Sequence, residues 1–299
     1  MRIAVTGGTG FVGRHLIRLL LERGHEVRAL VRRPERDPFR GSATIETVSG
    51  HLRDTEALRR LADGADAVVH LVGIIVERGS ATFEAVHVEG TRAVLEAARS
   101  AGCSRFVHMS AVGARDTPDA TPYHRTKARA EELVRSAGIA AAIFRPSFIV
   151  GPESVPIRVL ARLHRLLPAV PVFGDGQFPI QPVWVGDVAL AFAIATERAE
   201  LMGTFELGGP EVVSYEEFVR AVGRALGRPR PLVHVPLPLV RLAARACDPL
   251  GPLAPITSDQ LQMLTEGAAT PNNAMERVFG IRPRTLEEAL TFLSRRSVP

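Results

Sequence analysis

Short hydrophobic runs alternate with amphipathic segments from the first residues of the chain. Arg2–Val5 has the pattern of a strand, and the segment after it aligns apolar residues on one helical face before ending at Arg23 and Gly24. Further strands are predicted at Glu26–Val31, Ile45–Val48, Ala67–Leu71, Arg105–Met109 and Ala140–Phe144, with helices near 55–62, 82–100 and 123–136. Such alternation is typical of βαβ units and therefore of an α/β fold with a doubly wound, mainly parallel sheet.

The regular alternation weakens after Arg145, where prolines multiply. We expect residues 1–150 to form a dinucleotide-binding domain and residues 151–299 a smaller α/β lobe for a substrate or partner, interleaved with the first. Two helices of this lobe begin at the capping boxes Ser214 with Glu217 and Thr285 with Glu288, whose side chains satisfy otherwise free backbone donors.

Composition excludes several classes of function. Lys and Arg number 37 against 32 Asp and Glu, but the basic residues are scattered and do not alternate with aromatic ones, so no nucleic-acid partner is expected. The two cysteines, Cys103 and Cys247, have neither metal-ligand spacing nor a disulfide framework, which favours the cytoplasm and no metal site. We expect no signal peptide, and the apolar stretch 233–256 is too interrupted by Arg and Pro to span a membrane.

The strongest motif is the glycine-rich segment Thr6–Gly13 between the first strand and the first helix. Gly7 permits a tight turn, Gly10 lets the backbone approach a pyrophosphate, and Gly13 allows close packing of helix on strand. The alternative is an ordinary glycine-rich turn, but the G-x-x-G-x-x-G spacing favours a dinucleotide. The predicted contacts of the loop are Gly7, Thr9, Gly10, Phe11, Val12 and Gly13.

The end of the second predicted strand indicates which dinucleotide binds. An NAD site expects Asp or Glu there to accept from the ribose 2′-hydroxyl, whereas this chain has Arg32 and Arg33. Guanidinium groups suit the 2′-phosphate of NADP, so we predict NADPH over NAD, the alternative being a solvated basic strand end.

Tyr123 and Lys127 form the candidate catalytic pair, because residues four apart share a helix face. Lys127 is the only lysine in the chain, and only one other tyrosine, Tyr215, exists. A nearby ammonium, with the positive charge of a nicotinamide, can lower a tyrosine pKa from its usual value of about 10. The alternative is a surface tyrosine and a surface lysine at helical spacing, yet the retention of one lysine in an arginine-rich chain argues against coincidence.

These motifs resemble the extended branch of the short-chain dehydrogenase/reductase superfamily, the NAD-dependent epimerase/dehydratase-like proteins with a Rossmann-type fold. TGGTGFVG is similar to the family's phosphate loop, AVVHLVG to its fourth strand, HVEGTRAVLEAA to the following helix, YHRTK to its active-site motif, and FRPSFIVGP to the segment over the nicotinamide. The resemblance implies that His51 and Leu52 lie by the adenine, that Leu71, Val72 and Gly73 line the adenosine side, that Tyr123 and Lys127 also contact the cofactor, that Ser110 lies by the nicotinamide, and that Pro146 and Phe148 touch its ring.

The chain departs from the family pattern at several positions. His87 replaces the usual Asn, Gly50-His51 replaces Gly-Asp, and Ala111 stands where a substrate-polarising Ser or Thr is usual, with Ser110 beside it. The arginine of sugar-nucleotide enzymes is absent from residues 178–182. The segments GDGQFPIQPVWVGDVALAF and FELGGPEVVSYEEFVRAVGRALGR are instead similar to an atypical subgroup that includes the NADPH-binding accessory subunit of respiratory complex I and its bacterial relatives.

The favoured function is NADPH-dependent reduction of a carbonyl or quinone-like substrate, with Tyr123 as proton donor, Lys127 as its partner and Ser110 polarising the substrate oxygen. One alternative is a non-catalytic, NADPH-bound assembly protein that docks on a membrane or respiratory-complex partner, peripheral to the membrane. Another is a sugar-nucleotide epimerase. The segment 237–245 is either a basic amphipathic helix for such docking or, as we favour, a core-facing helix with two solvated arginines. The sequence indicates neither the substrate nor the oligomeric state.

Overall fold

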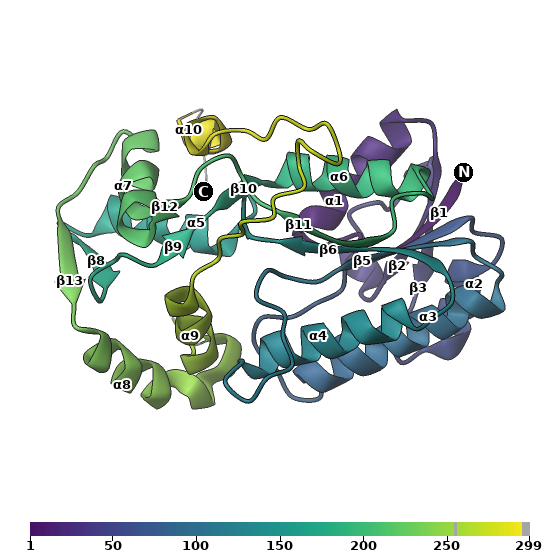
Figure 1. The fold of residues 1–299 in the computed structure, drawn as a ribbon, viewed down its shortest axis with the longest axis horizontal. Helices are drawn as coiled ribbons and strands as arrows, with labels where there is room; N and C mark the ends of the chain where they lie inside the picture. Colours follow the sequence, from purple (N-terminus) through teal and green to yellow (C-terminus); the bar gives the residue numbers. More distant parts are fainter. Residues whose placement is uncertain (254–255, 295–299) are drawn as a thin grey trace. The chain divides into compact units, whose positions relative to one another are not determined.

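The computed structural model describes residues 1–253 and 256–294 (Figure 1). Two compact units are present, the first made of Met1–Arg145 and Val188–Glu206, the second of Pro146–Asp187 and Leu207–Pro299. The segment 188–206 thus returns to the first unit, so the two units are interleaved along the chain. Among the described residues, no helix is long and apolar enough to cross a membrane.

The first unit is built on a seven-stranded sheet in the order β11-β6-β5-β4-β1-β2-β3. Its strands are β1 (Arg2–Thr6), β2 (Glu26–Val31), β3 (Ile45–Ser49), β4 (Ala67–His70), β5 (Arg105–Met109), β6 (Ala140–Pro146) and β11 (Gly203–Leu207). All pairings from β3 to β6 are parallel. This is the strand order of a dinucleotide-binding Rossmann sheet, whose direction of winding reverses between β1 and β4. The predicted doubly wound parallel sheet is therefore confirmed.

Helices cover both faces of this sheet. They are α1 (Phe11–Glu22), α2 (Thr55–Ala62), α3 (Gly90–Ser100), α4 (Pro122–Arg135) and α6 (Val185–Glu197), with short turns η1 (Pro34–Arg36) and η2 (Glu84–Glu89). Figure 1 shows α1 and α6 on one face and α2, α3 and α4 on the other. Buried residues of α2, α3 and α4 pack on one side of the strands, and Phe192 of α6 packs on Phe144 of β6, with ring centroids 4.4 Å apart.

One predicted helix differs from expectation. The pattern over 82–100 predicts a single regular helix, whereas the structure has a π-helical turn, η2, leading into α3. A π-helix adds a residue to each turn, is rare, and is found disproportionately at functional sites. This turn carries His87.

The second unit has a core of its own. Its strands are β7 (Phe148–Val150), β8 (Val170–Phe173), β9 (Pro179–Ile180), β10 (Pro182–Trp184), β12 (Val213–Ser214) and β13 (Leu232–Val235), and they form three two-stranded sheets. Its helices are α5 (Val155–Leu166), α7 (Tyr215–Ala225), α8 (Leu237–Cys247), α9 (Ser258–Glu266) and α10 (Leu286–Leu290), with turns η3 (Asp248–Leu253) and η4 (Thr291–Leu293). Both predicted capping boxes are present, at the starts of α7 and α10.

Candidate active site

The glycine loop forms the turn between β1 and α1. Side chains at Gly7, Gly10 and Gly13 would each crowd backbone atoms of the loop or of the segment after β4. A Cβ on Gly13 would lie 2.3 Å from the Gly7 carbonyl oxygen, and one on Gly7 would lie 3.0 Å from the backbone of Leu71 and Val72 after β4. Gly7 also has a φ of 76°, which favours glycine. Gly10 caps α1, so no capping side chain accepts from the first N–H groups of the helix. Such a helix start binds anions, and the loop therefore fits a pyrophosphate.

The residues predicted to contact the adenosine differ in exposure: Arg32, Arg33 and His51 are exposed, Leu52 and Val72 are half-buried, and Leu71 is buried. Arg32 and Arg33 directly follow β2 and are both exposed, at the same carboxyl edge of the sheet as the glycine loop. His51 follows β3 and is exposed, and its Nδ1 accepts from the Arg53 backbone N–H at 3.2 Å. Leu52 is half-buried and packs on the core beneath α3, so this side chain has a structural role beside any contact with a cofactor.

Tyr123 and Lys127 lie one turn apart at the start of α4, and both are buried. The helix begins with Pro122 in its first turn, after Thr121, whose side chain accepts from the His124 backbone N–H. The Lys127 Nζ donates to the carbonyl oxygen of Met109, the last residue of β5, at 2.9 Å. An ammonium has three donors, so two remain for other acceptors. The alternative of two surface residues is therefore wrong.

Burial shifts the pKa of both groups. It lowers the pKa of Lys127 from 10.5 to about 8, an effect that the carboxylate of Glu131 opposes. It raises the pKa of Tyr123 from 10.0 to about 12, because the ring lies among the rings of Phe83, His87 and His124. The expectation that the lysine lowers the tyrosine pKa is thus not met by the chain itself. The phenol is protonated at neutral pH and the ammonium is charged, which suits donation of a proton by the tyrosine.

Two further predicted site residues, Ser110 and Gly73, lie near Lys127. Ser110 directly follows Met109, whose carbonyl oxygen accepts from the Lys127 ammonium. Ser110 directly follows β5, is 4% exposed, and its Oγ has no hydrogen-bond partner among the described residues. Its backbone N–H donates to the carbonyl of Phe144 at 2.6 Å, which fixes the residue against β6. A Cβ on Gly73 would lie 3.0 Å from the Lys127 Nζ, so the absence of a side chain there leaves room for the ammonium.

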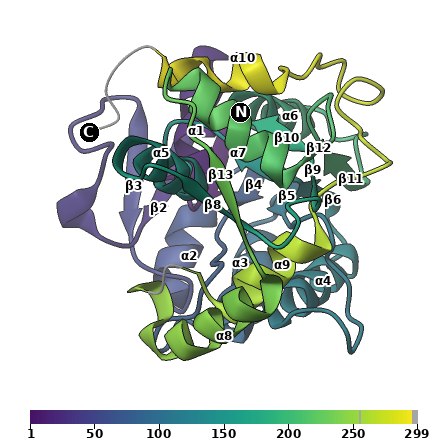
Figure 2. The same ribbon diagram turned by 90° about the vertical axis from the view of Figure 1, so that its left-hand side faces the viewer.

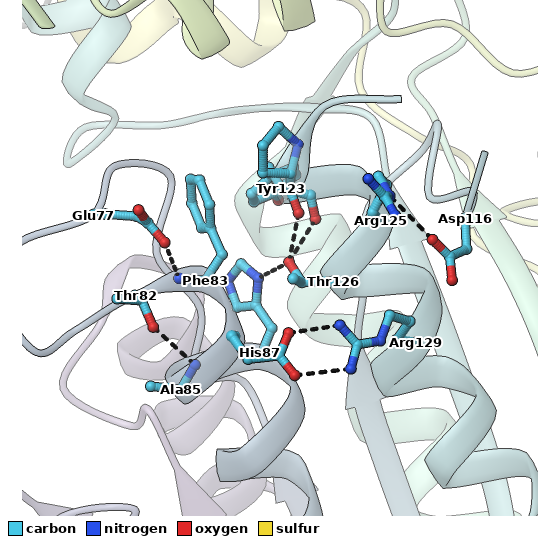
Figure 3. A network of polar contacts seen from close by, with 12 residues as sticks. Glu77, Thr82, Phe83, Ala85, His87, Asp116, Tyr123, Arg125, Thr126 and Arg129 are labelled. Carbon is cyan, nitrogen blue, oxygen red and sulfur yellow. Dashed lines mark hydrogen bonds and ion pairs between the residues drawn. The ribbon is translucent and has the colours of Figure 1, made fainter. Parts of the chain in front are cut away.

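His87 connects the loop after β4 to the start of α4 (Figure 3). Its Nε2 accepts from the Ile74 backbone N–H at 3.1 Å, so in the neutral ring the proton must be on Nδ1, which lies 2.9 Å from the Thr126 Oγ1. The Thr126 hydroxyl in turn donates to the carbonyl of Pro122 or Tyr123. Burial lowers the pKa of His87 to about 2, so the ring stays neutral with both nitrogens engaged. In the sequence, His87 is visible only as a departure from the family pattern, and its contacts with Ile74 and Thr126 cannot be predicted from it.

Two further buried histidines escaped sequence reasoning. His70 and His108 are register partners on β4 and β5, with rings stacked 5.4 Å apart. His70 lies between the hydroxyls of Thr6 and Thr91, at 2.6 and 3.1 Å. Burial lowers the pKa of His70 to about 3 and that of His108 well below its usual value, so both are neutral neighbours of Lys127.

Glu131 was also missed, although it lies four residues after Lys127. Its carboxylate is fully buried and accepts from Arg145, at 2.7 Å to both oxygens, and from Arg135. The Arg145 side chain joins the end of β6 to α4, and hydrogen bonding to Glu131 raises its pKa. The position of Glu131, four residues after Lys127, could have indicated a carboxylate on the same helix face as the lysine. Nothing in the sequence indicated its partner Arg145, which lies fourteen residues away.

Pro146 and Phe148 belong to the second unit, where Phe148 packs edge-on against Phe218 with ring centroids 5.1 Å apart. Their predicted contact with a nicotinamide stays a prediction. Within the described residues no group of His, Cys, Asp or Glu could hold a metal ion.

Comparison with known proteins assigns the family. A profile of the NAD dependent epimerase/dehydratase family matches residues 3–208. Ceramide reductase of Caulobacter vibrioides is 36% identical over 248 residues, covering 82% of this chain and 77% of that protein. The 2-alkyl-3-oxoalkanoate reductase of Stenotrophomonas maltophilia is 30% identical over 327 residues, covering 97% of each.

The chain is also similar to a subunit of a respiratory complex and to a solved epimerase structure. The mitochondrial NADH dehydrogenase [ubiquinone] 1 alpha subcomplex subunit 9 of Arabidopsis thaliana is 29% identical, covering 91% of this chain and 71% of that one. The UDP-glucose 4-epimerase of Thermus thermophilus, solved with NAD, has a TM-score of 0.75 at 24% identity, covering 99% and 98%, and shares the fold. The chain belongs to the NAD dependent epimerase/dehydratase family.

Proposed function

We propose that this chain is an NADPH-dependent reductase of a ketone carried by an amphiphilic, lipid-like substrate. Membership of the family makes it an NAD(P)-dependent oxidoreductase. The observation that carries the proposal is the buried pair Tyr123 and Lys127 at the start of α4, with the phenol protonated and the ammonium held by the Met109 carbonyl.

The chain's own groups divide the work of the reaction. A bound NADPH supplies the hydride to the carbonyl carbon. The glycine loop and the start of α1 would hold its pyrophosphate, and Arg32 and Arg33 its 2′-phosphate. Tyr123 donates its proton to the carbonyl oxygen, so that the ketone becomes an alcohol and the tyrosine a phenolate. Within the described part of the chain the Lys127 ammonium donates only to Met109, so two of its three donors could serve the ribose hydroxyls and this phenolate.

Ser110 is the candidate for polarising the substrate oxygen. Its buried hydroxyl lacks a partner among the described residues, and a buried unpaired hydroxyl is costly unless a ligand satisfies it. The Ala111 side chain cannot perform this task because a methyl group donates no hydrogen bond. His87 has a positioning role instead, because its Nε2 accepts from the Ile74 backbone N–H, its Nδ1 lies 2.9 Å from the Thr126 Oγ1, and burial lowers its pKa to about 2.

The substrate class is supported by the names of the relatives. They include ceramide reductase, 2-alkyl-3-oxoalkanoate reductase, and a ketoreductase of a farnesyl dihydroquinoline oxide from Stigmatella aurantiaca. Each name is that of a reductase, and the last two name substrates that carry alkyl or farnesyl groups. A sugar-nucleotide epimerase is disfavoured, because Arg32 and Arg33 suit NADP and residues 178–182 lack the family's arginine.

The experiment follows absorbance of NADPH or NADH with a panel of long-chain 3-oxo esters, 3-oxo sphingoid bases and water-soluble ketones. We expect turnover of the long-chain ketones with NADPH. The double variant Arg32→Ala and Arg33→Ala should lose affinity for NADPH but not for NADH, because only NADPH carries the 2′-phosphate. Equal use of both cofactors by the unaltered chain, unaffected by this variant, would contradict the NADPH assignment.

A second candidate is a non-catalytic, NADPH-bound assembly protein, favoured by the likeness to the complex I subunit and by Ala111 in place of a hydroxyl residue. Tight NADPH binding without turnover of any ketone in the panel would favour it. A bound ligand stabilises a fold by about 2.7 kcal/mol at a hundred times its Kd, so a purely structural cofactor is physically reasonable.

A further inference from the structure

Helix α8 presents leucines to solvent on the side opposite its core contacts. Val240 and Ala244 are buried against Leu261 of α9, which lies beside α8 in Figures 1 and 2. Leu239 and Leu242 are 58% and 67% exposed. At 100° per residue, Leu242 points almost directly away from Val240 and Ala244, with Leu239 and Ala246 on one side of that direction and the two arginines of the helix on the other. The prediction of a core-facing helix is therefore correct for Val240 and Ala244, but α8 also has an apolar side that is exposed.

Two arginines form the only charged stripe of this helix. Arg241 and Arg245 are one turn apart and both exposed, and neither donates a hydrogen bond to another described residue. The pKa of the nearby Asp248 is lowered chiefly by its hydrogen bonds from Ser258 and to a smaller extent by the charge of Arg245. The two arginines border the leucine side. We define the α8 face as Leu239, Leu242 and Ala246 together with Arg241 and Arg245.

The charge around the α8 face is one-sided. From Phe218 to Cys247 the chain has six arginines and neither Asp nor Glu. The nearest following carboxylate, Asp248, is engaged by the backbone N–H and hydroxyl of Ser258, where it holds the start of α9. On α7 just before the arginine-rich stretch, Glu216 is engaged by Arg220 and by His234 of β13. On α9, Asp259 and Glu266 are the remaining acidic groups.

We propose that the α8 face docks on a membrane surface rich in anionic lipid, with Leu239 and Leu242 inserted at the headgroup boundary and the arginines on lipid phosphates. A short helix with leucines beside arginines is the pattern of interfacial amphipathic helices. A second copy of the chain is the less suitable occupant, because a two-fold contact would bring the same arginines against each other. The surface also lacks the Tyr, Trp and Phe that protein interfaces favour.

The binding should be weak and sensitive to salt. Each arginine near an anionic surface strengthens binding about fivefold, and salt screens this attraction as the Debye length shortens. Inserting one leucine adds about tenfold. The docking is independent of the proposed reductase activity, so its test needs no substrate.

The test is co-sedimentation of the full chain with phosphatidylcholine vesicles, with and without phosphatidylserine, at low and high salt. We expect binding only to the vesicles with phosphatidylserine and loss of that binding at high salt. Leu242→Ser should weaken it about tenfold, and the double variant Arg241→Gln with Arg245→Gln about 30-fold, both by the estimates above.

Matched controls are available in the first unit. Met202→Ser removes an apolar side chain that is 59% exposed, and Arg18→Gln with Arg99→Gln removes the same charge as the α8 pair. These variants should bind as the unaltered chain does. The proposal is overturned by absence of binding at low salt, by equal binding to phosphatidylcholine alone, or by α8 variants that bind no worse than the controls. It is also overturned if Leu242→Ser converts a dimer to a monomer in sedimentation velocity, which would assign the face to a second copy.

Discussion

Replacement of Lys127 by methionine should stabilise the fold while abolishing turnover. Methionine is similar in length to lysine, is unbranched and carries no charge, so it can occupy the buried path of the lysine side chain. Replacing a buried charge by an apolar residue of similar volume is often stabilising. The variant thus separates the effect of Lys127 on the stability of the fold from its effect on turnover.

The magnitude follows from the shifted pKa. A lowering from 10.5 to about 8 corresponds to about 3 kcal/mol against the charged form at neutral pH. Loss of the hydrogen bond from Nζ to the Met109 carbonyl costs about 1 kcal/mol. The net gain is about 2 kcal/mol, or about 4 °C in Tm for a chain of this size.

The gain should also depend on pH in a defined direction. Between pH about 8 and 10.5 the unfolded chain holds a proton that folded Lys127 has released, so the unaltered chain gains stability from this group as pH rises. The difference between variant and unaltered chain should therefore be largest at pH 7 and shrink above pH 8. Urea unfolding of both proteins at several pH values measures it.

A control of opposite sign is Arg105→Met. Arg105 is equally buried, but its guanidinium donates to the carbonyls of Ala195, Ala199 and Leu201 at 2.8, 3.3 and 2.6 Å. Its loss strands three carbonyls and should destabilise the fold by about 3 kcal/mol or more. The reasoning is refuted if Lys127→Met is less stable than the unaltered chain at pH 7, or if its advantage is the same at pH 7 and pH 10.

Three further predictions concern the loop, the lysine and pH. Gly13→Ala forces a Cβ to within 2.3 Å of the Gly7 carbonyl oxygen, so NADPH binding measured by calorimetry should be lost. Retained affinity would contradict the proposal that the glycine loop holds the pyrophosphate. Gly73→Ala crowds the Lys127 Nζ at 3.0 Å, so kcat should fall while the circular dichroism spectrum is kept; an unchanged kcat would show that the ammonium has room to spare. Because Lys127 must be charged, kcat/KM should be level up to pH about 8 and then fall about tenfold per pH unit, whereas a flat profile to pH 10 would remove the lysine from the mechanism.

Local features were predictable from the sequence because short-range sterics determine them. The glycine spacing at residues 7–13 has one common structural context, a strand followed by a helix, and the structure has it. The tyrosine and lysine are brought together by helical spacing alone, so their proximity needed no knowledge of the tertiary fold. The alternation of strands and helices predicted the doubly wound, mainly parallel sheet, whereas the strand order comes from the structure.

Features that depend on tertiary contacts could not be predicted. The π-helical turn that carries His87 has no periodicity signal, and the ring's partners Ile74 and Thr126 lie on other elements. The predicted lowering of the Tyr123 pKa was wrong for the chain alone, because burial of the phenol raises this pKa and outweighs the Lys127 ammonium. Likewise, the pattern of α8 could not reveal which of its two apolar sides meets the core.

The most direct test of the account is the rate of NADPH oxidation by Tyr123→Phe, with Tyr215→Phe as the matched control. Both phenols are buried, and burial raises the pKa of each to about 12, but Tyr215 lies on α7 in the second unit. If Tyr123 is the proton donor, its variant should bind NADPH normally and lose turnover of a long-chain ketone, while Tyr215→Phe keeps it. Turnover by Tyr123→Phe equal to that of Tyr215→Phe would contradict the central claim.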